Sequence, residues 1–350
     1  MQAKTSDKAQ KIVVLGTGGT IAGLSTPERG AGAYVAGQKP IEDLLAGLTI
    51  PAALTGLAIE SEQVAQIDSK DMDVPVWQNL LRRCRHWLEQ AEVRGVLITH
   101  GTDTLEETAW LLQLGLAPLM QAHGKPVVLT CAMRPADAPD ADGPGNLRDA
   151  LQVLVEPPAQ GVLSVCAGRV MSARAVRKVH ATRLDAFDSS GAPDVARLVD
   201  EPPDLGGSSV RWSLAEDPGS AAPPPANRLA SMLAAAAWPR VELLLSHAGA
   251  SGALVRTLCD PDMAMRSGAS PLRGLVVAAT GNGTLHRELE AALREAQSHG
   301  VRVVIATRCA EGGLKAGHSG AVGVDMGFAT TDLSPVKARL SLMLELLDER

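Results

Sequence analysis

The chain has 350 residues, of which 45% are hydrophobic and 21% are charged, and its formal net charge is −6. These values are typical of an ordinary soluble globular protein, and the length favours two domains over one. The acidic balance gives no basic surface for nucleic acid or an anionic membrane, and an aromatic content of 2% argues against stacking platforms for bases.

The start of the chain and its cysteines predict a cytoplasmic protein. Residues 1–8 are polar, with no apolar segment of a signal peptide, and no apolar run is long enough to cross a bilayer. The cysteines are scattered and form no Cys-x-x-Cys pair; they are Cys84, Cys131, Cys166, Cys259 and Cys309. This pattern argues against a structural zinc site, and the odd number argues for a reducing compartment.

A glycine-rich turn follows the first predicted strand, 11–15. Residues 16–23 read Gly-Thr-Gly-Gly-Thr-Ile-Ala-Gly. A dinucleotide fingerprint needs glycine where Ile21 stands, and the lysine of a phosphate-binding P-loop is missing. The segment is either a flexible tight turn or a place where the backbone approaches a ligand and offers the hydroxyls of Thr17 and Thr20.

The segment from Gly23 to Gly37 is rich in glycine and contains Tyr34, the only tyrosine of the chain. Few large apolar groups accompany it, so the composition predicts a lid that closes over a substrate. The alternative is an exposed loop with an incidental tyrosine. Because aromatic residues are so scarce here, we expect the phenol to be used for its hydroxyl.

A second polar turn follows the predicted strand 95–99. Residues 99–104 read Thr-His-Gly-Thr-Asp-Thr, and Thr104 with Glu107 has the spacing of a capping box that starts a helix. Thr102 and Asp103 are therefore expected at the carboxyl edge of a sheet, where ligands bind in α/β proteins. His100 is expected to pack or to form a hydrogen bond at the strand end.

Strand and helix patterns alternate along the rest of the chain. The N-terminal set has strands at 11–15, 95–99, 126–131 and 161–167 and helices near 75–90, 104–118 and 145–155, which predicts a mainly parallel sheet covered on both faces. Residues 189–226 are rich in Ser, Gly, Pro and Asp and predict a linker or excursion. Further strands follow at 241–246, 274–280 and 301–307, with a last helix from Ser334.

These patterns predict two α/β domains joined by a linker. The larger N-terminal catalytic α/β domain is expected at 1–200, the linker at 201–238, and the smaller C-terminal α/β domain at 239–350. No repeat of solenoid period and no coiled coil is visible.

Residues 17–23 and 99–104 together resemble the two signatures of the bacterial-type L-asparaginase family, which includes glutaminase-asparaginases. Four further segments fall in the order of that family, at 68–72, 132–135, 141–147 and 281–283. The resemblance therefore covers nearly the whole chain.

The resemblance implies an amidohydrolase that converts L-asparagine to L-aspartate and ammonia through a threonyl acyl-enzyme, with direct displacement as the open alternative. Thr20 corresponds to the nucleophile, Tyr34 to the lid tyrosine, and Thr102 to the threonine on the other side of the substrate. Lys178 corresponds to the catalytic lysine and acts as base toward Thr102, while Asp103 contacts this lysine and the α-amino group of the substrate. No metal and no organic cofactor is implied.

The neighbourhood of Lys178 bears on that role. Most lysines are surface residues, but Arg174 and Arg177 are near in sequence, and adjacent positive charge disfavours the ammonium form.

Further residues are assigned to substrate binding by the same resemblance. Ser69, beside Asp68, matches the residue that holds the α-carboxylate, and Gly101 lies within the second signature. Family members are homotetramers built from close dimers, in which the C-terminal domain completes a neighbour's site; Asn282 and Thr284 match that contribution.

One family feature is missing from the sequence. The family often adds an intersubunit glutamate, but in residues 311–326 the only acids are Glu311 and Asp325, and neither aligns well. His318 and Ser319 lie nearer the expected place.

Four alternatives stay open at this stage. The nearest is a dual glutaminase-asparaginase, because the length of the pocket cannot be read from sequence. The others are a subunit of a tRNA-dependent amidotransferase, a catalytically silent amino-acid-binding protein, and an oxidoreductase.

Overall fold

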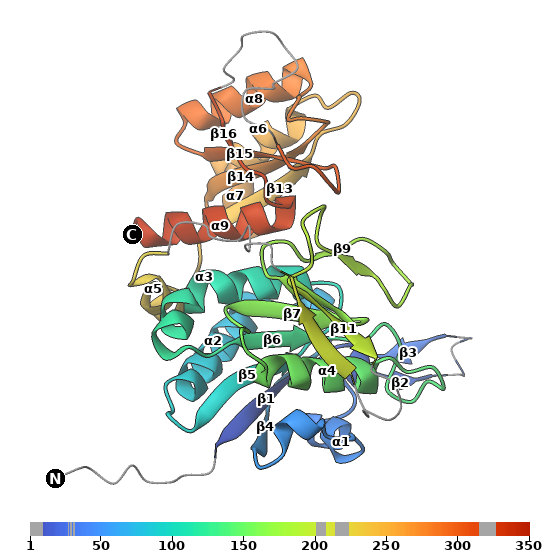
Figure 1. The fold of residues 1–350 in the computed structure, drawn as a ribbon. Helices are drawn as coiled ribbons and strands as arrows, with labels where there is room; N and C mark the ends of the chain where they lie inside the picture. Colours follow the sequence, from blue (N-terminus) through green and yellow to red (C-terminus); the bar gives the residue numbers. More distant parts are fainter. Residues whose placement is uncertain are drawn as a thin grey trace, which may run out of the picture. The chain divides into compact units, whose positions relative to one another are not determined.

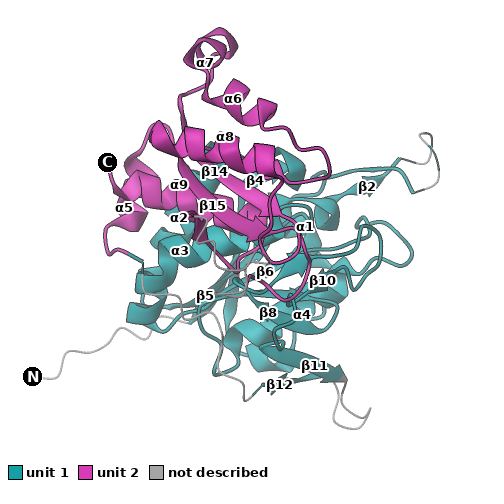
Figure 2. Ribbon diagram, turned by 90° about the horizontal axis from the view of Figure 1, so that it is seen from above, with its two compact units in different colours: residues 1–224 teal, residues 225–350 magenta. Residues whose placement is uncertain are grey.

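The computed structural model describes residues 10–26, 28, 30, 32–200, 208–213, 224–314 and 327–350. The chain divides into two compact units, Met1–Pro224 and Pro225–Arg350, which Figure 2 colours separately. Both units combine helices with a sheet (Figure 1), as the sequence predicted.

The first unit is built on an eight-stranded sheet with the order β12-β11-β8-β7-β6-β5-β1-β4. Its strands are β1 (Lys11–Gly18), β4 (Ala58–Ile67), β5 (Val93–Thr99), β6 (Val127–Thr130), β7 (Val162–Cys166), β8 (Arg169–Ser172), β11 (Ala196–Asp200) and β12 (Ser208–Trp212). The five strands from β4 to β7 are parallel, and β8, β11 and β12 continue the sheet in antiparallel pairs.

Helices cover both faces of this sheet. Helices α1 (Ile41–Ala46) and α4 (Gly143–Val155) pack with one face, and α2 (Val74–Leu88) and α3 (Leu105–His123) with the other. Alternate residues of β1 show why: Ile12 and Val14 join the core under α4, while Val13 and Leu15, which are equally buried, point to the opposite face. Such strands read as continuous apolar runs, and the sequence therefore revealed them.

Short elements surround the carboxyl edge of the sheet. They are the 3₁₀ turns η1 (Thr20–Ala22) and η4 (Ser69–Asp71), the ribbon β2 (Leu24–Ser25) with β3 (Tyr34–Val35), and the hairpin β9 (Arg177–Lys178) with β10 (Phe187–Asp188). A third 3₁₀ turn, η3 (Ala52–Leu54), precedes β4 and lies at the opposite, amino end of the strands. From β1 the next strand of this sheet along the chain, β4, lies on one side of β1, whereas β5, β6 and β7 follow one another on its other side. The order of the strands thus reverses between β1 and β5, which is where ligands bind in open α/β sheets.

The second unit has a smaller parallel sheet with the order β13-β14-β15-β16. Its elements are α5 (Arg228–Ala234), β13 (Arg240–Leu245), α6 (Ala253–Cys259), α7 (Pro261–Ser267), β14 (Leu272–Ala279), α8 (Arg287–Ser298), β15 (Arg302–Thr307), β16 (Ala329–Thr330) and α9 (Pro335–Asp348). Val255 and Leu293, from α6 and α8, share a core with Val277 and Ile305 of the sheet.

The structure contains strands and a helix in part of the region that the sequence predicted to be a linker. Strands β11 and β12 lie within residues 189–226 and pair antiparallel as part of the main sheet, and α5 lies within residues 201–238. The sequence did not reveal β11 and β12, because each has only five residues within a region rich in Ser, Gly, Pro and Asp. In addition, β12 forms the edge of the sheet. Residues 201–207 and 214–223 of the expected linker are outside the described part of the chain.

Two sequence expectations concern the membrane and the cysteines. In the part of the chain that the structure describes, no helix is both long and apolar enough to span a bilayer. All five cysteines are free thiols, three of them buried.

Candidate active site

Three turns meet at the carboxyl ends of β1, β4 and β5, and two glycines allow them to do so. Gly19 has a φ of 81°, and a Cβ atom there would lie 2.3 Å from the Cα atom of Gly101. A Cβ atom on Gly101 would in turn lie 2.5 Å from Ser69 Oγ. The Thr17 hydroxyl adds a bond to the Thr99 carbonyl oxygen, 2.8 Å away. The glycines of both signatures are thus explained by close backbone approach.

Thr20 stands at the first position of η1 and is 7% exposed. Its Oγ1 atom lies 2.9 Å from the hydroxyl of Tyr34, which comes from β3. The β2–β3 ribbon folds back over η1, so a residue 14 positions later in the chain reaches Thr20. The tyrosine lies 42% exposed at the outer side of this pair.

Thr102, Asp103 and Lys178 form a second polar group. Lys178 Nζ donates to Thr102 Oγ1 at 2.8 Å and to Asp103 Oδ1 at 2.5 Å. Thr102 is buried, the Lys178 side chain is 18% exposed and the Asp103 side chain is 53% exposed. Lys178 is thus ion-paired with a carboxylate, a partner that its sequence neighbours Arg174 and Arg177 do not reveal.

Ser69 links the second signature to η4. Its Oγ accepts a hydrogen bond from the Asp103 amide at 3.2 Å, and its carbonyl oxygen accepts one from the Thr104 hydroxyl at 2.7 Å. Asp68 caps η4 by accepting from the Lys70 amide. Helix α3 begins after Thr104, as predicted, but the Thr104 side chain makes no cap hydrogen bond because it is used to hold Ser69. That detail corrects the expected capping box.

The five predicted catalytic residues line one cavity of 820 Å³: Thr20, Tyr34, Thr102, Asp103 and Lys178. Ser69, Asp68 and Gly101 do not line it, although Ser69 and Gly101 are joined to its wall by the contacts above. The loop after β6 and the β9–β10 turn supply further lining residues, among them Met133, Arg134 and Thr182. These residues were not singled out for the site, although 132–135 was recognised as a family segment.

His100 lies at the end of β5, directly before Gly101, and is completely buried. Its Nδ1 atom is 2.7 Å from the Gly101 carbonyl oxygen, which can only accept, so Nδ1 carries the proton. Burial lowers the pKa of His100 to about 4, and this backbone bond offsets only part of the effect. The side chain is thus a neutral structural group at the strand end, in agreement with the sequence interpretation.

The residues expected from the second unit lie on one turn after β14. Thr280 and Thr284 close this turn: the Thr284 amide donates to the Thr280 carbonyl oxygen at 2.9 Å, and their hydroxyls lie 2.8 Å apart. Asn282 stands at its tip between two glycines of positive φ. Glu311 is exposed, whereas His318, Ser319 and Asp325 lie outside the described residues.

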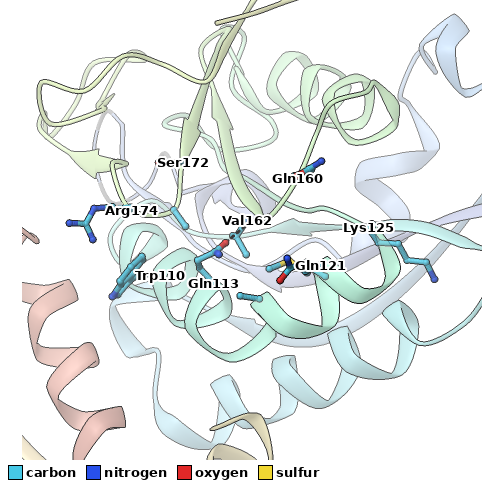
Figure 3. Close-up of a pocket in the computed structure, with 13 residues that line it drawn as sticks. Trp110, Gln113, Gln121, Lys125, Gln160, Val162, Ser172 and Arg174 are labelled. Atoms are coloured by element: carbon cyan, nitrogen blue, oxygen red, sulfur yellow. Dashed lines mark hydrogen bonds between the residues drawn. The ribbon is translucent and has the colours of Figure 1, made fainter. Parts of the chain in front are cut away.

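A second cavity, of 480 Å³, lies between α3 and strands β7 and β8 (Figure 3). Trp110, Gln113, Lys125 and Arg174 are among its lining residues, and no predicted site residue is. Lys125 Nζ donates to the carbonyl oxygens of Leu88 and Gln90, at 2.8 and 2.6 Å, so its charge is already engaged. Within the described residues, no group of three or more His, Cys, Asp or Glu side chains is arranged to hold a metal ion.

Comparison with known families gives two matches that together span most of the chain. The model "Asparaginase, N-terminal" matches residues 11–209, and the model "Glutaminase/Asparaginase C-terminal domain" matches residues 240–349.

Similar proteins extend over nearly the full length of the chain. L-asparaginase 2 of Bacillus subtilis is 32% identical over 98% of this chain and 85% of its own length. Glutaminase-asparaginase of Pseudomonas fluorescens biotype A is 30% identical over 99% of this chain and 88% of its own. The crystal structure of the probable cytoplasmic L-asparaginase from Campylobacter jejuni superposes with a TM-score of 0.78 at 32% identity, covering 96% of this chain and 95% of that one.

Proposed function

Because the chain belongs to the L-asparaginase family, we propose that it is an amidohydrolase that converts L-asparagine to L-aspartate and ammonia. The observation that carries the proposal is the pairing of two threonine hydroxyls with two activating groups around one cavity. Thr20 pairs with Tyr34, and Thr102 pairs with Lys178, which is itself bound to Asp103.

Substrate binding uses the charged ends of a free amino acid. Asp103 is half exposed beside the cavity, so its carboxylate can accept from the α-ammonium group of the substrate. Ser69, with Asp68 beside it, is assigned to the α-carboxylate end, and Gly101 lets Ser69 approach. Recognition of both charged ends favours a small free amino acid over a peptide.

The first half of the reaction forms the acyl-enzyme. Thr20 Oγ1 attacks the side-chain amide carbon, the carbon–nitrogen bond breaks, and the departing nitrogen takes up the hydroxyl proton by way of the Tyr34 oxygen. Ammonia leaves and an ester links Thr20 to the aspartyl group. The 2.9 Å contact between Thr20 and Tyr34 supports this path for the proton.

The second half returns Thr20 to its starting state. A water molecule held by Thr102 attacks the ester carbon, and its proton passes through the Thr102 hydroxyl to Lys178. The bond from that carbon to Thr20 Oγ1 breaks, Thr20 Oγ1 takes up a proton by way of the Tyr34 hydroxyl, aspartate leaves, and Lys178 releases its proton to solvent. Lys178 must be neutral to accept that proton. In direct displacement, the same Thr102–Lys178 pair activates the attacking water without an ester.

The proposal extends to domain roles, assembly and location. Residues 1–200 carry the catalytic residues, and 239–350 supply Asn282 and Thr284 to a neighbouring subunit in a homotetramer of close dimers. The cytoplasm is the proposed location, supported by the five free cysteines and by the named cytoplasmic neighbour. No metal or organic cofactor takes part in the proposed reaction.

The test is release of products by the purified protein. Release of one ammonia and one L-aspartate for each L-asparagine consumed supports the proposal. Absence of turnover would contradict it and favour an amino-acid-binding protein, whose binding of L-aspartate isothermal titration calorimetry would detect. The same assay with L-glutamine decides the second candidate, a dual glutaminase-asparaginase, which the Pseudomonas relative's name favours. Peptide mass spectrometry after acid quenching distinguishes an ester on Thr20 from direct displacement.

A further inference from the structure

A carboxylate outside the cavity holds the ribbon that carries Tyr34. Asp137, in the loop between β6 and α4, accepts three hydrogen bonds from Ser25. The Ser25 amide donates to Oδ1 at 2.9 Å and to Oδ2 at 3.1 Å, and the Ser25 hydroxyl donates to Oδ1 at 2.8 Å. Next to it, the Ala136 amide donates to the Gly23 carbonyl oxygen at 2.9 Å.

The bonded strand lies directly beside Tyr34. In the β2–β3 ribbon, Ser25 is paired with Tyr34 and Leu24 with Val35. A Cβ atom on Gly23 would lie 3.0 Å from Tyr34 Cδ2, so the tyrosine ring packs closely over the backbone of that residue. With two residues in each strand, the ribbon has few bonds of its own. Backbone bonds tie its base to η1, from the Gly37 amide to the Gly19 carbonyl oxygen at 3.0 Å and from the Gln38 amide to the Ala22 carbonyl oxygen at 2.6 Å. The part beyond this base, where Ser25 pairs with Tyr34, is held from outside by Asp137.

The loop that carries Asp137 is itself well anchored. At its base, the Asp142 carboxylate accepts from the amides of Met133 and Arg134, at 2.9 to 3.1 Å. Arg134 Nη1 donates to the carbonyl oxygen of Thr182, at 3.0 Å, in the turn of the hairpin that carries Lys178. One loop thus binds both the Tyr34 ribbon and the Lys178 hairpin.

Asp137 itself is exposed and does not line the cavity, so any effect on the reaction passes through the ribbon. The hydrogen bonds from Ser25 hold the pKa of its carboxyl below the ordinary value, and Lys39 contributes to the same direction. The carboxylate is therefore ionised at neutral and mildly acidic pH, where bonds from an amide and a hydroxyl to it are charge-assisted.

We propose that Asp137 is a positioning residue that docks the β2–β3 ribbon and thereby keeps the Tyr34 hydroxyl against Thr20. The docking is a property of the ribbon, and its effect on turnover rests on the proposed function.

The single tyrosine of the chain makes the docking directly measurable. Biosynthetic replacement of tyrosine by 3-fluorotyrosine gives one ¹⁹F resonance, from Tyr34 alone. In the folded full-length protein we expect the chemical shift of this resonance to differ from its value in urea. In the Asp137→Ala variant we expect the chemical shift to move toward the value in urea. Asp137→Asn keeps one carbonyl oxygen to accept from Ser25 and is expected to fall between the two. These spectra need no enzymatic activity.

Kinetics on unlabelled protein give the second readout. For Asp137→Ala we expect kcat/KM for L-asparagine to fall by about 10- to 100-fold, since small misplacements of catalytic groups have effects of this size. Ser25→Ala added to Asp137→Ala should cost little more, because both changes break the same contact. The control is Asp73→Ala, which removes an exposed aspartate that accepts from the Val76 amide as the cap of α2.

The outcomes separate the docking from the proposed function. The control should lose stability, as a lost cap does, while its ¹⁹F resonance and kcat/KM stay at the wild-type values. An unchanged resonance in Asp137→Ala, or equal effects of Asp137→Ala and Asp73→Ala on it, would overturn the docking role. A wild-type protein that does not hydrolyse asparagine contradicts the proposed function alone, because the resonance still reports the ribbon.

Discussion

The Tyr34 hydroxyl lies 2.9 Å from Thr20 Oγ1, and this contact joins an exposed side chain to a buried one. Tyr34→Phe removes the phenolic oxygen and leaves the ring in place. We expect kcat for L-asparagine to fall by about 100-fold or more, because in the proposed mechanism the hydroxyl relays the proton that leaves Thr20. Steady-state kinetics measure the loss, and the unfolding midpoint should stay near that of the wild type. A variant with unchanged kcat would remove Tyr34 from the chemistry.

Lys178→Met tests the role of the amine that binds Thr102 and Asp103. We expect loss of most of kcat and, in the activity that is left, loss of the decline toward acid pH that a basic role of the amine predicts for the wild type. Thr102→Val should be comparably damaging, and the double variant little worse than either, since both groups act as a unit. A pH profile that Lys178→Met leaves unchanged would mean that the lysine only positions Asp103.

The charged partner of Lys178 in the structure differs from the neighbours that the sequence indicated. From sequence, the positive charges of Arg174 and Arg177 favoured a neutral amine, because only near neighbours in the chain can be seen there. Asp103 precedes Lys178 by 75 positions and reaches its Nζ through the fold. The sequence could identify both residues from motifs, but the ion pair between them depends on how the β9–β10 hairpin packs against the turn after β5.

The buried His100 predicts a stability that depends on pH. In the unfolded chain this histidine binds a proton below its ordinary pKa of 6.5, whereas burial lowers the pKa in the folded chain to about 4. Between these values the unfolded state binds more protons, so the free energy of unfolding falls as the pH decreases from 6.5 to 4. The loss reaches about 3 kcal/mol at most. Urea denaturation at several pH values, with His100→Asn as the comparison, measures it; equal slopes for the two proteins would contradict the assignment.

The parts of the fold that the sequence predicted are those with simple patterns. Strands β1, β5, β6 and β7 are continuous apolar runs because helices cover both of their faces. Strand β4 went unrecognised because it forms the sheet edge and its middle, residues 60–63, is a run of four polar residues, Glu-Ser-Glu-Gln, with neither an apolar run nor an alternation. The contact of Ser25 with Asp137 crosses 112 positions and has no local signal at all. Long-range contacts between loops are what a single sequence conceals.

Sharing of the site between subunits can be tested by mixing two inactive variants. Thr20→Ala lacks the proposed nucleophile, and Asn282→Ala lacks a group that the proposal assigns to the neighbouring site. Hybrid oligomers formed by refolding the two together should regain activity, because some sites then receive both intact residues. Each variant refolded alone is the control. No recovery in oligomers shown to be hybrid, or full specific activity of a monomeric form, would contradict a shared site.

Replacement of Glu311 tests whether this residue takes the place of the intersubunit glutamate that the sequence lacks. It is exposed in the second unit and does not align with the glutamate of the family. Glu311→Ala is therefore expected to leave the Michaelis constant for L-asparagine nearly unchanged, with Asp103 alone binding the α-amino group. Initial rates over a range of substrate concentrations measure this constant, and a large increase would assign Glu311 to that role.

Thr20→Ala tests the central claim most directly. The side chain is 7% exposed and loses only a hydroxyl and a methyl group, so the variant should fold, and Thr20→Ser, which keeps the hydroxyl, is the matched comparison. Ammonia release from L-asparagine is measured for the wild type and both variants. We predict ammonia and aspartate in equal amounts from the wild type, reduced turnover from Thr20→Ser and none from a folded Thr20→Ala. Wild-type turnover by Thr20→Ala would contradict threonine catalysis at this position.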